Sequence, residues 1–207
     1  MSILLKTSRS DEKLPTGSSK LLGNPDVWDG FEWPAIEENG ELYDLTFICQ
    51  ISCADAAPFD SDGLLPKAGM LYFFYDLDEM PETPDNKTAA RVLYYNGDLS
   101  DLREMLLTDE IGDDIAFHEQ KIEFENVTEG YLSDKEPTHL LLGVPSLGYV
   151  EEYDYMKQWK MLFQLDSFET EDTVVNFTDE GVLCFFIESE KLKSLDFSDV
   201  RIMQIYS

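Results

Sequence analysis

The chain has 207 residues, of which 43% are apolar and 13% aromatic, so it is long and apolar enough to bury a sizeable core. Its formal net charge of -28 argues against partners with dense negative charge, so we expect no nucleic-acid binding and no membrane binding. Three cysteines, no signal-peptide pattern and no apolar run near ~20 residues indicate a cytoplasmic protein without a disulfide framework.

Most of the predicted elements are strands. Short apolar runs bounded by Gly, Pro and polar residues are typical of strands, and two polar-capped stretches with spaced leucines are typical of short helices. In chain order, we predict strands over 3–5, 47–51, 69–74 and 91–95, a helix over 98–107, strands over 122–124, 161–165 and 181–186, a helix over 190–195 and a strand over 201–206. The Pro- and Gly-rich segment 24–42 is predicted to wrap over the core without regular structure.

Several stretches occur twice in the same order. Gly23, Gln50 and Gly69, each within a similar local sequence, have counterparts in Gly143, Gln164 and Gly181. This pattern predicts an internal duplication over approximately 3–96 and 121–206, with the helix near 98–107 as the link. The expected fold is therefore β-dominant α+β, with two duplicated halves packed as one globular unit in a single domain, 1–207.

Six motifs follow one another along the chain: Ser19-Lys20-Leu21-Leu22-Gly23-Asn24-Pro25, Phe31-Glu32-Trp33-Pro34, Cys49-Gln50-Ile51, Gly69-Met70-Leu71-Tyr72-Phe73-Phe74, Gln164-Leu165-Asp166-Ser167 and Asp179-Glu180-Gly181. In this order and spacing they resemble the YwqG-like family of bacterial proteins. The resemblance implies a compact, β-rich α+β fold, an intracellular setting and no assigned activity. Members of that family often occur near toxin and immunity systems, and the resemblance supplies no catalytic residues.

The cysteines and histidines do not have the spacing of a metal site. Cys49 and Cys53 lie four residues apart, but His118 and His139 lie far from each other in the chain, whereas structural zinc sites use two closely spaced ligand pairs. We therefore predict no metal and no cofactor. Neither histidine has a sequence partner that marks it as a general base, so we expect no catalytic residues.

Gln50 and Gln164 lie within otherwise apolar strands. A buried amide has to pair two donors and an acceptor, so each glutamine either fastens an adjacent loop or lines a cleft between the two halves, together with Asp166. Trp28 and Trp33 lie among several glutamates. They either pin a loop onto the core or form an aromatic and acidic patch suited to a basic side chain.

The acidic residues are unevenly placed: between Leu21 and Pro66 there are ten Asp or Glu residues and no Lys or Arg. Such a surface attracts a basic protein, or it serves solubility alone. The sequence favours a non-enzymatic binding protein whose acidic surface engages a basic protein partner, in an immunity-like role. The alternative is a small-ligand binder or hydrolase-type enzyme with a site between the halves.

Overall fold

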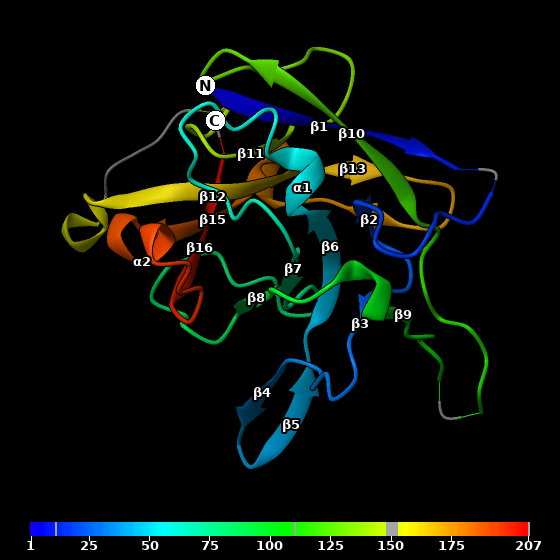
Figure 1. Ribbon diagram of the computed structural model, residues 1–207. Helices are drawn as coiled ribbons and strands as arrows, with labels where there is room; N and C mark the ends of the chain where they lie inside the picture. Colours follow the sequence, from blue (N-terminus) through cyan, green and yellow to red (C-terminus); the bar gives the residue numbers. More distant parts are fainter. Residues whose placement is uncertain (11, 110, 148–152, 207) are drawn as a thin grey trace.

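The computed structural model of the protein describes residues 1–10, 12–109, 111–147 and 153–206 (Figure 1). The described residues form sixteen strands and two short α-helices. The strands are β1 (Ser2–Arg9), β2 (Lys20–Leu21), β3 (Asp26–Val27), β4 (Ala35–Glu38), β5 (Glu41–Asp44), β6 (Thr46–Ser52), β7 (Met70–Tyr75), β8 (Ala90–Tyr95), β9 (Arg103–Glu104), β10 (Gln120–Val127), β11 (His139–Leu141), β12 (Trp159–Asp166), β13 (Phe168–Glu169), β14 (Val174–Val175), β15 (Val182–Glu188) and β16 (Val200–Ile205). The helices are α1 (Cys53–Ala56) and α2 (Ser189–Lys193).

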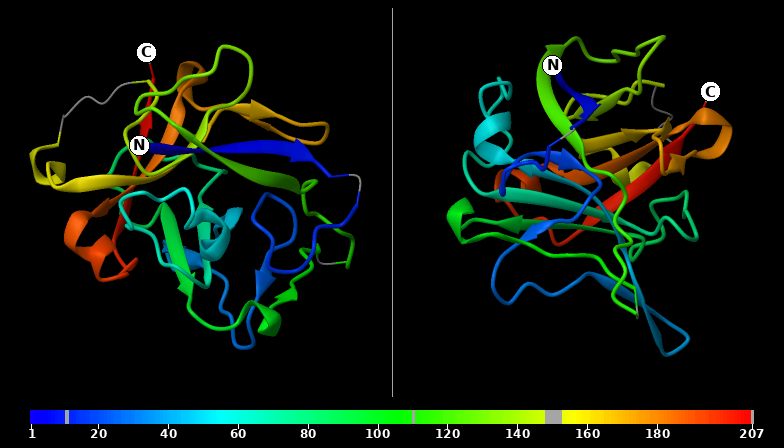
Figure 2. Two further views of the ribbon diagram at one scale, coloured as in Figure 1. Left: turned by 45° about the horizontal axis from the view of Figure 1, so that its top comes forward. Right: turned by 90° about the vertical axis from the view of Figure 1, so that its right-hand side faces the viewer.

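Ten strands form one antiparallel sheet in the order β16-β15-β12-β11-β1-β10-β2-β6-β7-β8. The sheet curls until its two edge strands, β8 and β16, approach each other (Figure 2). Residues of the loop after β7 bridge these edges: the backbone N of Gln204 donates to the carbonyl oxygen of Glu82 (2.9 Å), and its side-chain amide donates to that of Met80 (3.0 Å). The sheet is therefore nearly closed on itself.

Two β-bulges accompany this curvature. The pairing register shifts between Phe47 and Cys49 in β6 and between Met161 and Phe163 in β12, so that each strand carries one extra residue. A bulge bends its strand and increases the local twist. The bulges thus lie where β6 and β12 turn with the curling sheet.

The central strands bury both of their faces. In β7, Leu71 and Phe73 point into the main core inside the curled sheet, whereas Tyr72 and Phe74 point to the outer face. Aromatic side chains of segment 28–33 cover that outer face. An apolar residue at every position of β7 is thus explained by burial on both sides.

The predicted fold class, a β-dominant α+β chain made of two duplicated halves, is wrong. The two α-helices of the described residues span only four and five residues, and the sheet dominates. β1 pairs with β10 on one side and with β11 on the other, although both partners come from the C-terminal part of the chain. Segments 3–96 and 121–206 therefore contribute to one continuous sheet instead of forming two packed halves.

Two local predictions are also wrong. The helix predicted over 98–107 is a single 3-10 turn, Leu99–Asp101, capped by Asp98 and followed by β9, which pairs with β3. The segment predicted to be irregular over 24–42 contains β3 and the β4–β5 hairpin, which projects from the sheet (Figure 1). The hairpin turn is Asn39-Gly40, and both residues have positive φ (54° and 86°), as a type I′ turn requires.

Gly69 and Gly40 provide a matched test of close packing at the start of β7. Both have φ +86°, but a Cβ on Gly69 would lie 2.1 Å from the carbonyl oxygen of Tyr95, whereas a Cβ on Gly40 would meet nothing within 4 Å. We expect Gly40→Ala to lower the free energy of unfolding by about 1 kcal/mol, because of its backbone conformation alone. Gly69→Ala should lower the free energy of unfolding by at least about 2 kcal/mol more than Gly40→Ala does, because the backbone at Tyr95 has to move away from the new Cβ. Urea unfolding of both variants measures the difference, and equal losses would contradict the close approach.

Candidate functional site

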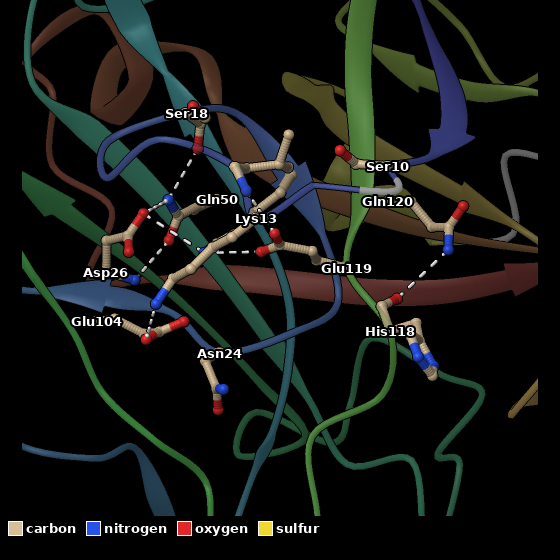
Figure 3. A network of polar contacts seen from close by, with 12 residues as sticks. Ser10, Lys13, Ser18, Asn24, Asp26, Gln50, Glu104, His118, Glu119 and Gln120 are labelled. Atoms are coloured by element: carbon tan, nitrogen blue, oxygen red, sulfur yellow. Dashed lines mark hydrogen bonds and ion pairs between the residues drawn. The ribbon is translucent and has the colours of Figure 1, made fainter.

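Gln50 lies in β6 and is fully buried. Its Oε1 accepts a hydrogen bond from the backbone N of Asp26 (2.8 Å), and its Nε2 donates to the carbonyl oxygen of Ser18 (2.8 Å) and to Oδ2 of Asp26 (2.7 Å) (Figure 3). Its donors and its acceptor are thus all paired. Gln50 ties two loops to the sheet, the one before β2 and the one that leads into β3.

A buried lysine lies beside this amide. The side chain of Lys20 in β2 is 2% exposed, and its Nζ lies 3.5 Å from Oδ2 of Asp26 and 3.3 Å from Oε2 of Glu119. The same Asp26 oxygen accepts from the backbone N of Gly17 (2.9 Å), and Oε1 of Glu119 accepts from that of Leu14 (2.8 Å). Because an unpaired buried charge costs several kcal/mol, these contacts stabilise one another. The cluster holds the loop before β2 in place.

Gln164 lies in β12 and is also fully buried. Its Oε1 accepts from the backbone N of Ser146 (2.9 Å), and its Nε2 donates to the carbonyl oxygen of Thr138 (2.6 Å) and to Oγ of Ser146 (2.9 Å). Four strands of the sheet separate β12 from β6. The two glutamines therefore anchor separate loops, and the structure does not bring them together.

Asp166 ends β12 and lies, half-buried, in the wall of an open groove of about 440 Å³. Its Oδ2 accepts from the backbone N of Thr138 (2.6 Å). Burial raises the pKa of this carboxyl, against the opposing effect of hydrogen bonds from backbone N–H groups. We call this the acidic groove; its charged lining residues are Asp134, Lys135, Glu136, Asp166, Glu169 and Glu180. Five carboxylates against one ammonium make it attractive to cations.

His139 of β11 lies behind Asp166 and is buried. Its Nδ1 accepts a hydrogen bond from the backbone N of Asp166 (3.1 Å), and its ring packs edge-on against Phe168 at 5.4 Å between centroids. Its Nε2 is buried without a hydrogen-bond partner among the described residues. Burial lowers the pKa of His139 to about 4, so the ring is neutral at pH 7.

Trp28 and Trp33 lie half-buried on the outer face of β7. Trp28 stacks on Tyr95 at 5.1 Å between ring centroids, and Nε1 of Trp33 donates to the carbonyl oxygen of Leu45 (2.8 Å). Phe31 lies between the two indoles, 5.0 Å from Trp28 and 6.0 Å from Trp33. These contacts pin segment 28–33 onto the sheet. The two tryptophans share one cluster, and neither lines the acidic groove with Asp166.

Trp33 also borders a second groove, of about 560 Å³, which is mostly apolar. We call it the apolar groove; it is lined by Leu22, Gly23, Trp33, Asp44, Leu45, Thr46, Phe47, Met105, Leu106, Leu107, Thr108, Ile115, Ala116 and Phe117. One wall comes from the junction of β5 and β6, and the other comes from segments 105–108 and 115–117. Sequence analysis missed this groove because its walls are far apart in the chain.

His118 and Asp172 form a pair that sequence analysis also missed. Nδ1 of His118 lies 2.7 Å from Oδ2 of Asp172, and the backbone N of His118 donates to the same oxygen (2.7 Å). Burial works to raise the pKa of Asp172, but hydrogen bonds from His118 and Thr170 hold it below its usual value. An imidazole oriented by a carboxylate through Nδ1 has the arrangement of a general base.

The thiols have no such arrangement. Cys49, Cys53 and Cys184 are free and buried, and burial raises the pKa of Cys53 to about 12, which keeps this thiol protonated. Within the described parts of the chain, no three His, Cys, Asp or Glu side chains lie close enough to hold a metal ion.

A protein-family model described as a domain of unknown function (DUF1963) matches residues 19–204. The chain belongs to the DUF1963 family. Comparison with curated proteins gave no match. Among the described residues of this DUF1963 domain, no helix is long and apolar enough to cross a membrane.

Replacing either buried glutamine of the DUF1963 domain tests its anchoring role. Gln50→Leu and Gln164→Leu each leave buried backbone groups unpaired, so we expect each to lower the free energy of unfolding by about 3 kcal/mol. Gln158→Leu, at an exposed position, is the control and should stay within about 0.5 kcal/mol of the parent protein. Urea denaturation gives the values, and a loss below about 1 kcal/mol for the buried positions would contradict the anchoring role.

His139 predicts a pH-dependent stability. Its pKa is about 4 in the folded protein against 6.5 ordinarily, so the unfolded chain takes up a proton first as the pH falls. The stability is retained above pH 6.5 and decreases between pH 6.5 and pH 4, by about 3 kcal/mol for a shift of this size. His139→Asn keeps an acceptor for the Asp166 N–H and removes this titration. Unfolding free energies measured over this range should fall more steeply for the parent than for the variant, and parallel curves would contradict the assignment.

Proposed function

We propose that this DUF1963 domain is a cytoplasmic, non-enzymatic binding protein whose acidic surface engages a basic protein partner. Its role in this proposal is immunity-like: it covers a cationic protein, such as a toxin, and neutralises it. The acidic groove around Asp166 is the observation that carries the proposal. The finer family placement, a single YwqG-like domain of a bacterial protein over 1–207, is part of the same proposal and rests on the sequence motifs.

The geometry of the acidic groove supports a cationic occupant. Its charged residues come from three separate parts of the chain, 134–136, 166–169 and Glu180, instead of lying along one strand. Charges of one sign that line a concave surface focus the electric field and raise the local concentration of oppositely charged groups. The overall charge of -28 adds long-range attraction, which speeds the approach of a basic protein at low salt.

One observation favours the alternative of a hydrolase-type enzyme. His118, held by Asp172, borders an open groove of about 620 Å³ whose other lining residues are Arg9, Gln120, Glu169, Thr170 and Glu171. The guanidinium of Arg9 is paired with Glu171, so the oriented imidazole alone is what favours this alternative. This alternative predicts turnover that depends on His118, whereas the binding proposal predicts partner binding that is independent of it.

Partner binding should depend on salt and on the acidic groove. The immobilised protein should retain a basic protein from a native lysate at about 50 mM salt and release it at about 500 mM, because exposed ion pairs are screened. A purified model probe, a deca-lysine peptide, then allows quantitative comparison. A triple variant should bind the deca-lysine peptide about tenfold more weakly, since each exposed ion pair contributes up to about 1 kcal/mol. Its substitutions are Glu136→Gln, Glu169→Gln and Glu180→Gln.

The matched control removes the same number of charges elsewhere. Asp62, Asp78 and Glu79 are exposed and do not line the acidic groove, so their combined change to Asn, Asn and Gln should weaken binding much less. Equal weakening by both triple variants would show that net charge acts without the groove. A protein that retains nothing basic at low salt, yet is stabilised by a small molecule, would support the alternative.

A further inference from the structure

The apolar groove combines one buried wall with one exposed apolar wall. Leu45 and Phe47, at the junction of β5 and β6, belong to the first wall and are almost fully buried. Opposite them, Leu106 is 61% exposed and Ile115 is 58% exposed, and Phe117 is also exposed. Exposed apolar side chains that gather around a hollow, instead of being scattered, mark an interaction site.

Further apolar side chains lie on the two elements that supply the walls. Leu42 and Tyr43, on β5, are exposed, and so is Ile111, in the loop between segments 105–108 and 115–117. The β4–β5 hairpin projects beyond the sheet, as does the segment after β9 (Figures 1 and 2). These side chains add exposed apolar surface to the same two elements.

The same two elements carry acidic residues and no basic ones. In the sequence, neither 35–46 nor 104–117 contains a Lys or Arg. The described acids of these elements are Glu37, Glu38, Glu41, Asp44, Asp109, Asp113 and Asp114, together with Glu104, which is paired with Lys13. The groove therefore has an apolar lining between two acidic elements, and this combination constrains its occupant.

We infer that the apolar groove docks a segment of the basic partner in which Leu, Ile or Phe side chains are interspersed with Lys or Arg. The apolar side chains cover the exposed walls, and the cations meet the carboxylates of the two flanking elements. A second copy of this chain is disfavoured, because it would bring acidic elements against acidic elements. This inference rests on the proposed function and assigns it a second contact surface, apart from the acidic groove.

Two peptides of equal charge separate apolar docking from charge attraction. One alternates Lys with Leu and the other alternates Lys with Ser, and each has about ten residues. At about 150 mM salt, where surface charges are partly screened, the protein should bind the Lys/Leu peptide at least about tenfold more tightly. Isothermal titration calorimetry measures both affinities.

Surface variants then locate the preference. Leu106→Gln with Ile115→Gln removes the exposed apolar walls without changing the charge, and it should reduce the preference for the Lys/Leu peptide to less than about twofold. Val144→Gln with Leu195→Gln is the control, because both residues are exposed apolar positions outside the groove. The control should keep the full preference. Unchanged melting temperatures establish that both double variants are folded.

Each contrary result has a distinct meaning. If both peptides bind equally well, the inference is overturned and the proposed function stands. If neither peptide binds, the inference is overturned, and the proposed function fails as well only if deca-lysine also does not bind at about 50 mM salt. If a Leu/Ser peptide without charge binds as tightly as the Lys/Leu peptide, or if the protein forms a dimer that Leu106→Gln and Ile115→Gln dissociate, then the groove has an occupant other than a basic segment and the inference is overturned.

Discussion

The exclusion of water from both faces of β7 is the constraint on which much of this structure depends. A strand with apolar side chains on both faces needs a cover on each side, and one curled sheet can supply only the inner one. Trp28, Phe31 and Trp33 supply the outer cover, and their packing determines where the chain enters the β4–β5 hairpin. The hairpin in turn leads into the wall of the apolar groove, so packing within the core positions a surface feature.

Buried polar groups impose a second constraint at the sheet. Four polar side chains are almost fully buried from solvent, and each is paired with a loop or with another charge: Gln50, Gln164, Lys20 and Asp26. An amide or a charge without partners would destabilise the fold by several kcal/mol, so the loops they hold have little freedom to move. The acidic groove lies beside one of these anchored loops, and the carboxylate of Asp166 is itself bonded to that loop at the backbone N of Thr138.

The sequence allowed most of the sheet to be predicted, because runs such as Met70–Tyr75 and Val182–Ile187 are apolar throughout. It also indicated loop anchoring by Gln50 and Gln164 as one of two alternatives, since a polar side chain inside an apolar strand needs partners. The α+β class was wrong because leucine spacing over 98–107 suggested a helix, whereas pairing of β9 with β3 determines that backbone. Asn39-Gly40 carried a usable hairpin signal that the prediction overlooked.

Other features had no local signal. His118 and Asp172 are 54 residues apart, and the burial of Lys20 depends on Glu119, which lies 99 residues away. The lining of the apolar groove likewise comes from segments that meet only in the folded chain. Contacts of this kind follow from the topology of the sheet, which the spacing of residues along one sequence does not determine.

The position of β1 has a consequence for biosynthesis. β1 is synthesised before its two neighbours, β10 and β11, so it lacks both partners until residues 120–141 have been made. Pairing at such long sequence separation is slow to form and leaves strand edges exposed in the meantime. A nascent chain of this protein is therefore most in need of a chaperone before residues 120–141 have been made.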